Sequence, residues 1–383
     1  MSLTPSELHR YSRHIILPEF NLAGQERLKA SKVLVVGAGG LGSPVLLYLA
    51  AAGIGTIGIV EFDRVEEHNL QRQVLYGTSD LGESKAFSAK ERVLDLNPHV
   101  EVRVHEEALR SDNALDIIRD YDIVADGTDN FATRYLVNDA CVLLGKVNVY
   151  ASIFRFDGQV SVFNLALLDG SRGPNYRDLY PTPPPPGMVP SCAEGGVLGV
   201  LPGIIGSMQA TEVIKIAAGI GEPLSGRLFL FDALTFESRT LKFRKDPRNP
   251  ISGDNPTITQ LIDYEQFCGI VPPSEESRAG SISVVELKSM RDRGEAFQLI
   301  DVREPYEFAI AEIGGELIPL AEIADRQAEI RRDIPVVIHC RSGKRSAQAI
   351  ETLRAQGEWP NLLNLDGGIL AWIDQIDPTL ARY

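Results

Sequence analysis

The chain is poor in cysteine, with only four in 383 residues: Cys141, Cys192, Cys268 and Cys340. None lies in a Cys-X-X-Cys pair, which excludes a thioredoxin-type motif and the usual zinc motifs, and so few thiols suit a reducing compartment. The sequence also lacks an apolar run long enough to cross a bilayer, because the stretch 197–208 is short and contains Pro202 and three glycines. No basic segment followed by an apolar core opens the chain, so we expect no secretion signal and a cytoplasmic location.

Positive charge is scarce as well. The formal net charge is −14, which argues against a nucleic-acid partner and against an anionic membrane. An apolar content of 44% and a charged content of 23% are typical of a soluble globular protein. A length of 383 residues is enough for two or three domains.

A glycine-rich turn lies between two predicted strands near the start of the chain. The run Val33–Val36 predicts a strand, an apolar helix pattern follows the turn, and Ile57–Asp63 predicts a second strand that ends in acids. Strand, turn, helix and strand predict a βαβ unit whose glycines let main-chain N–H groups approach a phosphate. The turn glycines are Gly37, Gly39, Gly40 and Gly42. A structural turn without a ligand, or a dinucleotide redox enzyme, fits the same pattern.

Polar residues after the predicted strands are candidates to bind the nucleotide. Glu61 lies where nucleotide-binding folds place an acid on ribose hydroxyls. Arg72 and Lys85 suit the neutralisation of a triphosphate. Asp129 follows a predicted strand at 121–125 and is a candidate Mg²⁺ ligand, although an aspartate N-cap without a ligand fits as well. From composition alone, we expect Arg13 to be an ordinary solvated arginine.

A proline-rich loop at 181–196 carries Cys192 and precedes a predicted helix at 203–218. Four consecutive prolines exclude a central strand there. A cysteine just before a helix can be unusually nucleophilic, and the alternative is an unreactive loop thiol. Further predicted strands at 100–104, 147–152 and 159–164, with a hairpin at 229–243, complete a mixed sheet.

A second chemical motif surrounds Cys340, which ends a predicted strand at 335–339 and precedes a predicted helix at 347–356. The loop N–H groups can form an anion nest around the sulfur, and nearby cations favour a thiolate or a persulfide over a thiol. The loop residues are Arg341, Ser342, Gly343, Lys344, Arg345 and Ser346. A cysteine-type phosphatase places an arginine six positions after the cysteine, where this chain has Ser346, so we favour sulfur transfer over dephosphorylation. A buried structural cysteine is the plain alternative.

These motifs match a known pairing of domains. Residues 5–245 resemble the ubiquitin-activating-enzyme-like adenylyltransferases of the ThiF and MoeB type. The matching motifs are GAGGLG at 37–42, EFD at 61–63, HNLQRQ at 68–73, Lys85 and GTDN at 127–130. Residues 281–383 resemble a rhodanese domain, through DVREPYEF at 301–308 and CRSGKRS at 340–346. Both domains in this order resemble a fused adenylyltransferase–sulfurtransferase.

The resemblance implies an α/β protein in which a Rossmann-like ATP-binding adenylation domain precedes a smaller α/β rhodanese domain. We expect the first domain at 1–246, a linker at 247–280 and the second domain at 281–383. The resemblance also implies a homodimer in which Arg13 reaches the ATP of the partner subunit, with Cys192 as the family's loop cysteine and Cys340 as the persulfide carrier. The implied ATP and Mg²⁺ positions are Gly37, Gly39, Gly40, Gly42, Glu61, Asp63, His68, Asn69, Leu70, Gln71, Arg72, Lys85, Asp129 and Asn130.

The sequence departs from these families at three places. Relatives often bind a structural zinc through two CxxC pairs, but here the corresponding stretches, 174–178 and 248–252, contain no cysteine, so we expect no zinc. The usual aspartate before Phe-Asp is Glu61, which is one methylene longer. A motif that often reads His-Ile-Pro-Gly is Ala-Glu-Ile-Gly-Gly at 311–315.

The resemblance implies adenylation of the Gly-Gly carboxylate of a small ubiquitin-like sulfur-carrier protein, followed by sulfur transfer from a Cys340 persulfide to give a thiocarboxylate. The sulfur donor would be a cysteine desulfurase or thiosulfate. Alternatives are a non-catalytic scaffold that docks a carrier protein and an NAD-dependent oxidoreductase. Molybdenum cofactor, thiamin, cysteine, siderophore and tRNA thiolation pathways all fit this chemistry.

Overall fold

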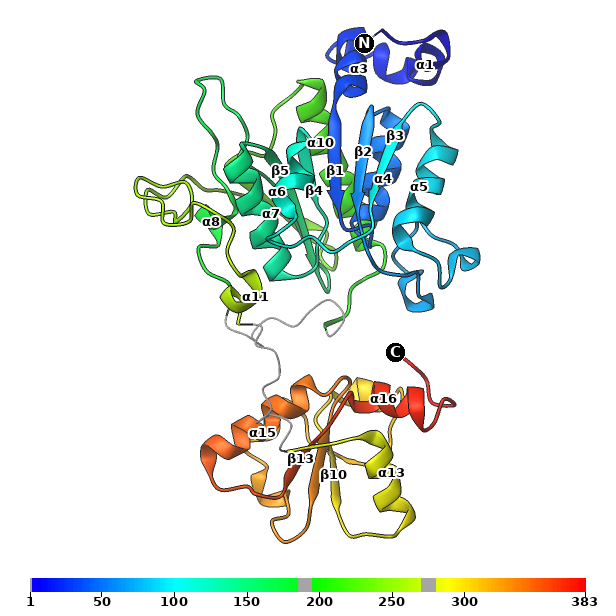
Figure 1. Cartoon of the computed structure of the whole chain (residues 1–383), viewed down its shortest axis with the longest axis vertical. Coiled ribbons are helices and arrows are strands. Elements are labelled where there is room, and N and C mark those ends of the chain that lie inside the picture. Colours follow the sequence, from blue (N-terminus) through cyan, green and yellow to red (C-terminus); the bar gives the residue numbers. More distant parts are fainter. Residues whose placement is uncertain (1, 185–194, 270–279) are drawn as a thin grey trace. The chain divides into compact units, whose positions relative to one another are not determined.

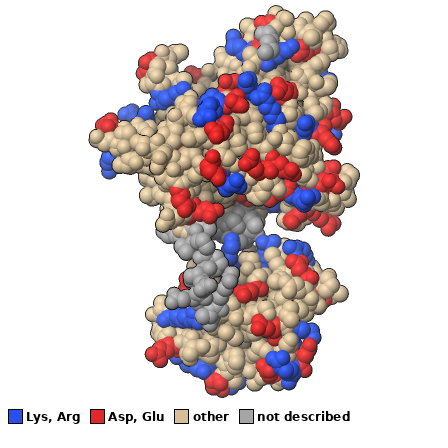
Figure 2. All heavy atoms as spheres, viewed as in Figure 1, with Lys and Arg blue, Asp and Glu red and all other residues tan. Residues whose placement is uncertain are grey.

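The computed structural model describes residues 2–184, 195–269 and 280–383. The chain divides into two compact units, residues 1–270 and 271–383 (Figure 1). Both are α/β, which confirms the predicted fold class. Within the described ranges, no helix combines the length and the apolar composition that a membrane span requires. Acidic side chains are spread over the visible face of each unit (Figure 2), in keeping with the net charge of −14.

The first unit is built on an eight-stranded sheet in the order β3-β2-β1-β4-β5-β6-β7-β8. The strands β3 to β5 along this order are parallel, and the pairs from β5 to β8 are antiparallel. Val36 lies opposite Val60 on one side and Asp126 on the other, so the residues after β1, β2 and β4 meet at one edge of the sheet. The strands are β1 (Lys32–Val36), β2 (Thr56–Val60), β3 (Glu101–His105), β4 (Ile123–Asp126), β5 (Val147–Phe154), β6 (Asp157–Phe163), β7 (Arg227–Asp232) and β8 (Glu237–Lys242).

Helices cover both faces of this sheet because its central strands are apolar on both sides. Val33 and Val35 of β1 belong to the core under α4, α5 and α10, whereas Leu34 and Val36 belong to the core under α6 and α7. This alternation follows from the period of two residues in a strand. The helices are α1 (Pro5–Arg10), α2 (Ser12–Ile15), α3 (Asn21–Ala30), α4 (Gly42–Ala52), α5 (Lys85–Leu96), α6 (Ala114–Arg119), α7 (Phe131–Leu144), α8 (Tyr176–Leu179), α10 (Leu201–Ala218) and α11 (Tyr264–Phe267), with short 3₁₀ turns η1 (Glu67–Asn69) and η2 (Thr78–Asp80).

The stretch after β8 packs on the first unit. Ile251, Tyr264 and Cys268 are buried, and Tyr264 and Cys268 belong to the core beside α7. The Tyr264 hydroxyl donates a hydrogen bond to the buried Asp139 carboxylate at 2.8 Å. Residues 247–269 therefore make their buried contacts within this unit.

The second unit has a five-stranded parallel sheet in the order β11-β10-β12-β13-β9. β12 is the central strand and is fully buried, so the residue that follows it lies at the middle of the carboxyl edge. The strands are β9 (Ser281–Ile282), β10 (Gln298–Asp301), β11 (Glu316–Leu317), β12 (Val336–His339) and β13 (Leu362–Leu365). The helices are α13 (Val284–Asp292), α14 (Pro305–Phe308), α15 (Lys344–Gln356) and α16 (Gly368–Gln375), with short turns η3 (Leu320–Glu322) and η4 (Gln327–Glu329).

Candidate active sites

The glycine turn after β1 requires glycine at two positions. Gly37 has φ = +88°, a conformation that L side chains rarely adopt, and its N–H donates to the Val60 carbonyl at 2.9 Å. A Cβ on Gly42 would lie 2.0 Å from the Gly37 carbonyl oxygen. The turn therefore folds back on itself and starts α4 at Gly42, with main-chain N–H groups at the carboxyl edge of the sheet.

Glu61 binds this turn through its carboxylate. One oxygen accepts from the Ala38 N–H at 3.0 Å, and the other accepts from the N–H groups of Phe62 and Asp63 at 2.8 and 2.9 Å. The side chain is buried. The sequence did not predict this contact between the Glu61 side chain and the main chain of the turn. The role of Glu61 on the ribose stays a prediction.

The predicted cations lie beside the turn and have local partners. Lys85 is buried at the start of α5, and its Nζ lies 3.2 Å from the Asp63 carboxylate. The Arg72 guanidinium donates to the His68 carbonyl at 3.1 Å, and its Cγ would lie 3.7 Å from a Cβ on Gly40. The structure thus places Arg72 beside the glycine turn and pairs Lys85 with Asp63, and their roles on the triphosphate stay predictions.

Two buried amide oxygens next to the turn have no hydrogen-bond partner among the described residues: Asn69 Oδ1 and Gln73 Oε1. His68 bonds to the Asn69 amide at 3.1 Å and to Glu66 at 3.2 Å, whereas Leu70 is half-buried and Gln71 is exposed. Unsatisfied buried acceptors are costly unless a ligand or water completes them. These acceptors suit donors on a ribose or a base, whereas the glycine cradle, the buried lysine and the arginine suit phosphates, so together the residues fit a nucleoside triphosphate.

The end of β4 places a carboxyl group that the sequence analysis missed. Asp126 is buried, and one of its oxygens accepts from the N–H and the hydroxyl of Thr128 at 3.0 and 2.6 Å, while Oδ2 has no partner in the described part of the chain. Burial raises the pKa of Asp126 above its ordinary value. Asp129 and Asn130 are exposed at the start of α7, where Asn130 caps the helix through the Thr133 N–H at 2.9 Å. The signal that could have revealed Asp126 is its place as the last residue of a buried strand.

Two predicted residues are not brought to this site. Arg13 is exposed on α2, which lies between α1 and α3 in the sequence. Both α1 and α3 lie at the amino edge of the sheet, where α3 leads into β1 (Figure 1). Arg13 therefore lies at the opposite edge from the glycine turn of its own chain. Cys192 lies outside the described residues.

In the second unit, Cys340 follows β12 and begins a tight loop. Its sulfur accepts from the Gly343 N–H at 3.2 Å and lies 3.5 Å from the Ser346 hydroxyl, whose one proton can be donated either to the sulfur or to the Gly343 carbonyl at 3.0 Å. Gly343 has φ = +91°. The side chain of Cys340 is buried. The Gly343 N–H therefore points toward the sulfur, and the anion nest around it stays a prediction.

The predicted cations of this loop contact other groups. Arg345 forms a two-fold ion pair with the buried Glu307, at 2.6 and 2.7 Å, which raises the pKa of Arg345 although burial alone would lower it. Arg341 donates to the main-chain oxygen of Tyr383 at 2.8 and 2.6 Å. Lys344 is exposed, and Ser342 is half-buried. Among the described residues, the hydrogen-bond contacts of the sulfur are with Gly343 and Ser346.

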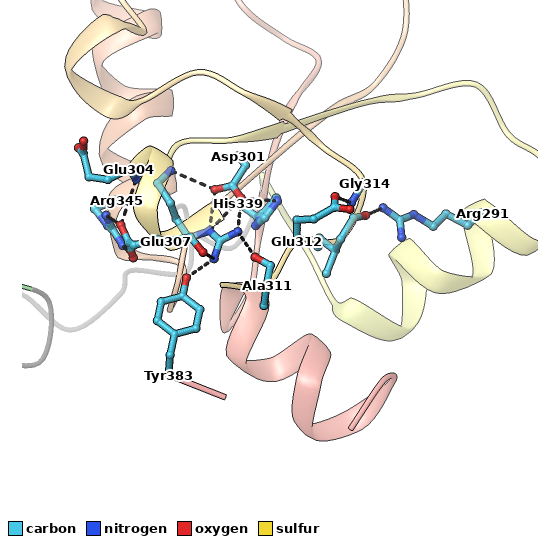
Figure 3. Close-up of polar contacts among 12 residues, drawn as sticks. Arg291, Asp301, Glu304, Glu307, Ala311, Glu312, Gly314, His339, Arg345 and Tyr383 are labelled. Atoms are coloured by element: carbon cyan, nitrogen blue, oxygen red, sulfur yellow. Dashed lines mark hydrogen bonds and ion pairs between the residues drawn. The ribbon is translucent and has the colours of Figure 1, made fainter. Parts of the chain in front are cut away.

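A buried charged cluster, which the sequence did not predict, lies at the end of β10, next to the strand that leads into the Cys340 loop. Asp301 and Arg303 are fully buried and form an ion pair, and the Arg303 guanidinium also bonds to the Ala311 carbonyl at 2.8 Å and to the Tyr383 hydroxyl (Figure 3). His339, directly before Cys340, lies 3.7 Å from the Asp301 carboxylate, and burial lowers its pKa to about 4. Ala311 belongs to the stretch that departs from the His-Ile-Pro-Gly motif, so this stretch contacts the cluster through its main chain.

The stretches for which we expect no zinc are joined by hydrogen bonds. Asn175 Nδ2 donates to Ser252 Oγ at 2.7 Å, and Asn249 Nδ2 donates to Asp178 Oδ1 at 2.7 Å and to Asn175 Oδ1 at 3.3 Å. Asn175 and Asp178 are separated by two residues, as are Asn249 and Ser252, which is the spacing of a CxxC motif. In the described ranges, no group of three or more His, Cys, Asp or Glu side chains is placed to hold a metal.

The fold and the two sites define a class: a Rossmann-like nucleotide-binding unit joined to an α/β unit with an anion-binding cysteine loop. The ThiF family model matches residues 11–251, and the Rhodanese-like domain model matches residues 283–375. The chain therefore belongs to the ThiF family and carries a rhodanese-like domain in its C-terminal part.

Named relatives cover most or all of the chain. It is 51% identical over 387 residues to the "Probable adenylyltransferase/sulfurtransferase MoeZ" of Mycobacterium tuberculosis, covering 100% of this chain and 97% of that protein. It is 57% identical over 270 residues to the "Sulfur carrier protein adenylyltransferase" of Thermus thermophilus, covering 70% of this chain and 100% of that protein. The E. coli MccB structure with ATP matches 65% of this chain and 75% of its own, with a TM-score of 0.54 and 22% identity, which supports the fold.

Proposed function

We propose that this protein uses ATP to adenylate the C-terminal Gly-Gly carboxylate of a small ubiquitin-like sulfur-carrier protein and then converts that carboxylate to a thiocarboxylate with sulfur carried on Cys340. The observation that carries the proposal is that one chain contains both a glycine cradle with Arg72 and Lys85 beside it and a cysteine whose sulfur accepts main-chain and hydroxyl hydrogen bonds. The likeness to relatives named for both activities, over the whole chain, supports it.

The first half-reaction makes the carrier carboxylate a better acyl donor. A carboxylate oxygen of the carrier attacks the α-phosphate of ATP, an acyl-adenylate forms and pyrophosphate leaves. Arg72 and Lys85 would stabilise the negative charge that develops on the phosphates, since positioned cations act on charge at the transition state. Asp129 would hold Mg²⁺, which would help to neutralise charge on the phosphates, with the buried Asp126 as a second carboxyl nearby in sequence.

The second half-reaction transfers sulfur. A persulfide anion on Cys340 attacks the acyl carbon and AMP leaves, which gives an acyl disulfide between the carrier and Cys340. A thiolate then attacks the Cys340 sulfur of that disulfide, so that the carrier leaves as a thiocarboxylate and a new disulfide forms on Cys340. Cys192 would supply that thiolate, or would form a thioester with the carrier earlier. The sulfur donor would be a cysteine desulfurase or thiosulfate.

The assembly proposed is a homodimer in the reducing cytoplasm. Its support is the position of Arg13, exposed at the amino edge of the sheet and away from the glycine turn of its own chain. In a dimer this arginine would reach the triphosphate of the partner subunit. The domains proposed are an adenylation domain at 1–246, a linker at 247–280 whose first part, 247–269, packs on the adenylation domain, and a rhodanese domain at 281–383.

Two variants separate the two halves. Asp129→Ala should abolish ATP–pyrophosphate exchange that depends on a carrier protein ending in Gly-Gly; retained exchange would refute the metal-ligand role. Cys340→Ala should keep that exchange but stop the replacement of oxygen by sulfur in the carrier, measured by mass spectrometry. Cys268→Ala is the matched control, because that thiol lies outside both sites and should change neither readout. A scaffold would show no exchange in the wild type.

A further inference from the structure

Tyr383 lies against two arginines of the cysteine-loop site. Its hydroxyl bonds to the buried Arg303 guanidinium, and its main-chain oxygen accepts from Nε and Nη2 of Arg341 at 2.8 and 2.6 Å. The ring centroid lies 5.6 Å from the Arg303 guanidinium carbon and 5.7 Å from that of Arg341. Figure 3 shows the phenol pointing into the cluster that includes Asp301 and Ala311.

Three guanidinium groups near Cys340 thus each have an oxygen partner, but the partners differ in how they are held. Arg303 pairs with Asp301 at the end of β10, and Arg345 pairs with Glu307 on α14. Asp301 and Glu307 are both buried in regular structure.

The partner of Arg341 is held differently. Tyr383 belongs to the segment 377–383, which follows α16 and contains no helix or strand. Segments outside helices and strands open at a lower free-energy cost than the elements of a core. Of these three pairings, the contact between Tyr383 and Arg341 is therefore the one that opens with the least change in structure.

We propose that Tyr383 is a specificity-determining residue, whose main-chain oxygen occupies the guanidinium fork of Arg341 and keeps small oxyanion sulfur donors from binding there until the segment 377–383 moves away. A planar guanidinium fork is the side chain best suited to hold a sulfonate or sulfate group. A donor that brings its sulfur as a persulfide has no such oxygens and does not compete with Tyr383. This inference rests on the proposed sulfur transfer by Cys340.

The reaction that reveals the effect is sulfur loading from thiosulfate. The Cys340 thiolate attacks the outer sulfur of thiosulfate, the bond between the two thiosulfate sulfurs breaks, and sulfite leaves with the bonding electron pair. The product is a persulfide anion on Cys340, and no external oxidant or reductant is consumed. Cyanide then accepts the outer sulfur as thiocyanate, which restores the thiolate and can be measured by its coloured iron complex.

The test uses the full chain with thiosulfate and cyanide as the two substrates. Tyr383→Ala removes the ring and the hydroxyl that hold the segment, so we expect the KM for thiosulfate to fall about tenfold while kcat changes less than about twofold. Tyr383→Phe keeps the ring and loses only the bond to Arg303, so its KM should fall by a smaller factor. Inhibition by sulfate, an inert oxyanion, should strengthen in parallel in both variants.

Arg382→Ala is the matched control from the same segment. The exposed pair of Arg382 with Asp374 contributes little to holding the segment, and loss of one cation should leave the KM for thiosulfate unchanged or raise it. An unchanged or raised KM in Tyr383→Ala, with tryptophan fluorescence showing a folded second unit, would overturn the inference. If Tyr383→Ala does not fold, an unchanged KM and sulfate inhibition in Tyr383→Phe would overturn it. A wild-type protein that forms no thiocyanate would instead show that the proposed sulfur transfer fails.

Discussion

Asn249 donates a hydrogen bond from Nδ2 to the Asp178 carboxylate at 2.7 Å, between residues that are 71 positions apart in the sequence. The same carboxylate oxygen accepts from the Asp246 N–H at 2.9 Å. With Asn175 and Ser252, these groups join the start of α8 to the stretch after β8. Neutral amides, a hydroxyl and one carboxylate thus connect the two stretches for which we expect no zinc.

Removing the Asn249 amide should loosen this connection. Asn249 is buried, so Asn249→Leu leaves the Asp178 carboxylate without its side-chain donor, and we expect the free energy of unfolding of the first unit to fall by about 2–3 kcal/mol. Chemical denaturation followed by far-UV circular dichroism measures this change. Ser252→Ala, which removes a single neutral acceptor, is the milder control and should cost about 1 kcal/mol. A variant Asn249→Leu as stable as the wild type would show that the network contributes nothing.

The carboxylate of Glu61 should matter for the glycine turn as well as for the nucleotide. Glu61→Gln keeps the length of the side chain but supplies one acceptor oxygen for the three N–H groups that the carboxylate binds. We expect the KM for ATP in pyrophosphate exchange to rise about tenfold or more and the first unit to lose about 1–3 kcal/mol. Glu61→Asp keeps the negative charge but shortens the side chain by one methylene. A smaller rise in the KM for ATP in Glu61→Asp than in Glu61→Gln would show that the charge matters more than the length of the side chain. Unchanged kinetics in Glu61→Gln would contradict both roles.

Much of the fold could be predicted because the hydrophobic periodicity is strong. The predicted strands at 100–104, 121–125, 147–152 and 159–164 correspond to β3 to β6 with ends that differ by two residues or fewer. Residues 247–269 were harder to predict, because their polar composition favours a linker. In the structure Tyr264 is buried and donates to Asp139, which also pairs with Arg177. The hydrogen bond between Tyr264 and Asp139 joins positions that are 125 residues apart, so a local sequence pattern cannot predict it.

The candidate sites were predictable where chemistry and chain position coincide. The glycine turn and the Cys340 loop lie at strand ends, and Lys85 lies at a helix start, and the sequence marks all three directly. The partners of the charged side chains were not predictable, because Glu307 meets Arg345 and Tyr383 meets Arg341 only through the fold. Sequence alone therefore located the cations of the loop but not the groups that neutralise them.

Gly343 should be intolerant of a side chain. Its φ of +91° is outside the range that alanine adopts easily, and its N–H is one of the two donors to the Cys340 sulfur. We expect Gly343→Ala to cost the second unit about 1–2 kcal/mol and to lower the rate of thiocyanate formation about tenfold or more. Pyrophosphate exchange should stay at the wild-type rate. Gly294→Ala is the matched control, since Gly294 also has a positive φ of +66°, has open space around a Cβ, and lies outside the loop. Equal rates for the two variants would remove the proposed role of the Gly343 N–H.

The stability of the second unit should fall as the pH is lowered from 7 to 5. Burial lowers the pKa of His339 to about 4, below the value of about 6.5 in an unfolded chain, so the unfolded state binds the proton first. The stability is present above pH 6.5 and decreases toward pH 4, with a loss of about 2 kcal/mol between pH 7 and pH 5. Both tryptophans, Trp359 and Trp372, lie in this unit, and His339 is its only histidine, so denaturation followed by tryptophan fluorescence isolates the effect. His339→Leu should abolish the slope, because neither ring nitrogen has a hydrogen-bond partner among the described residues and leucine does not titrate. A slope that persists in His339→Leu would assign the pH dependence to the carboxylates of the unit.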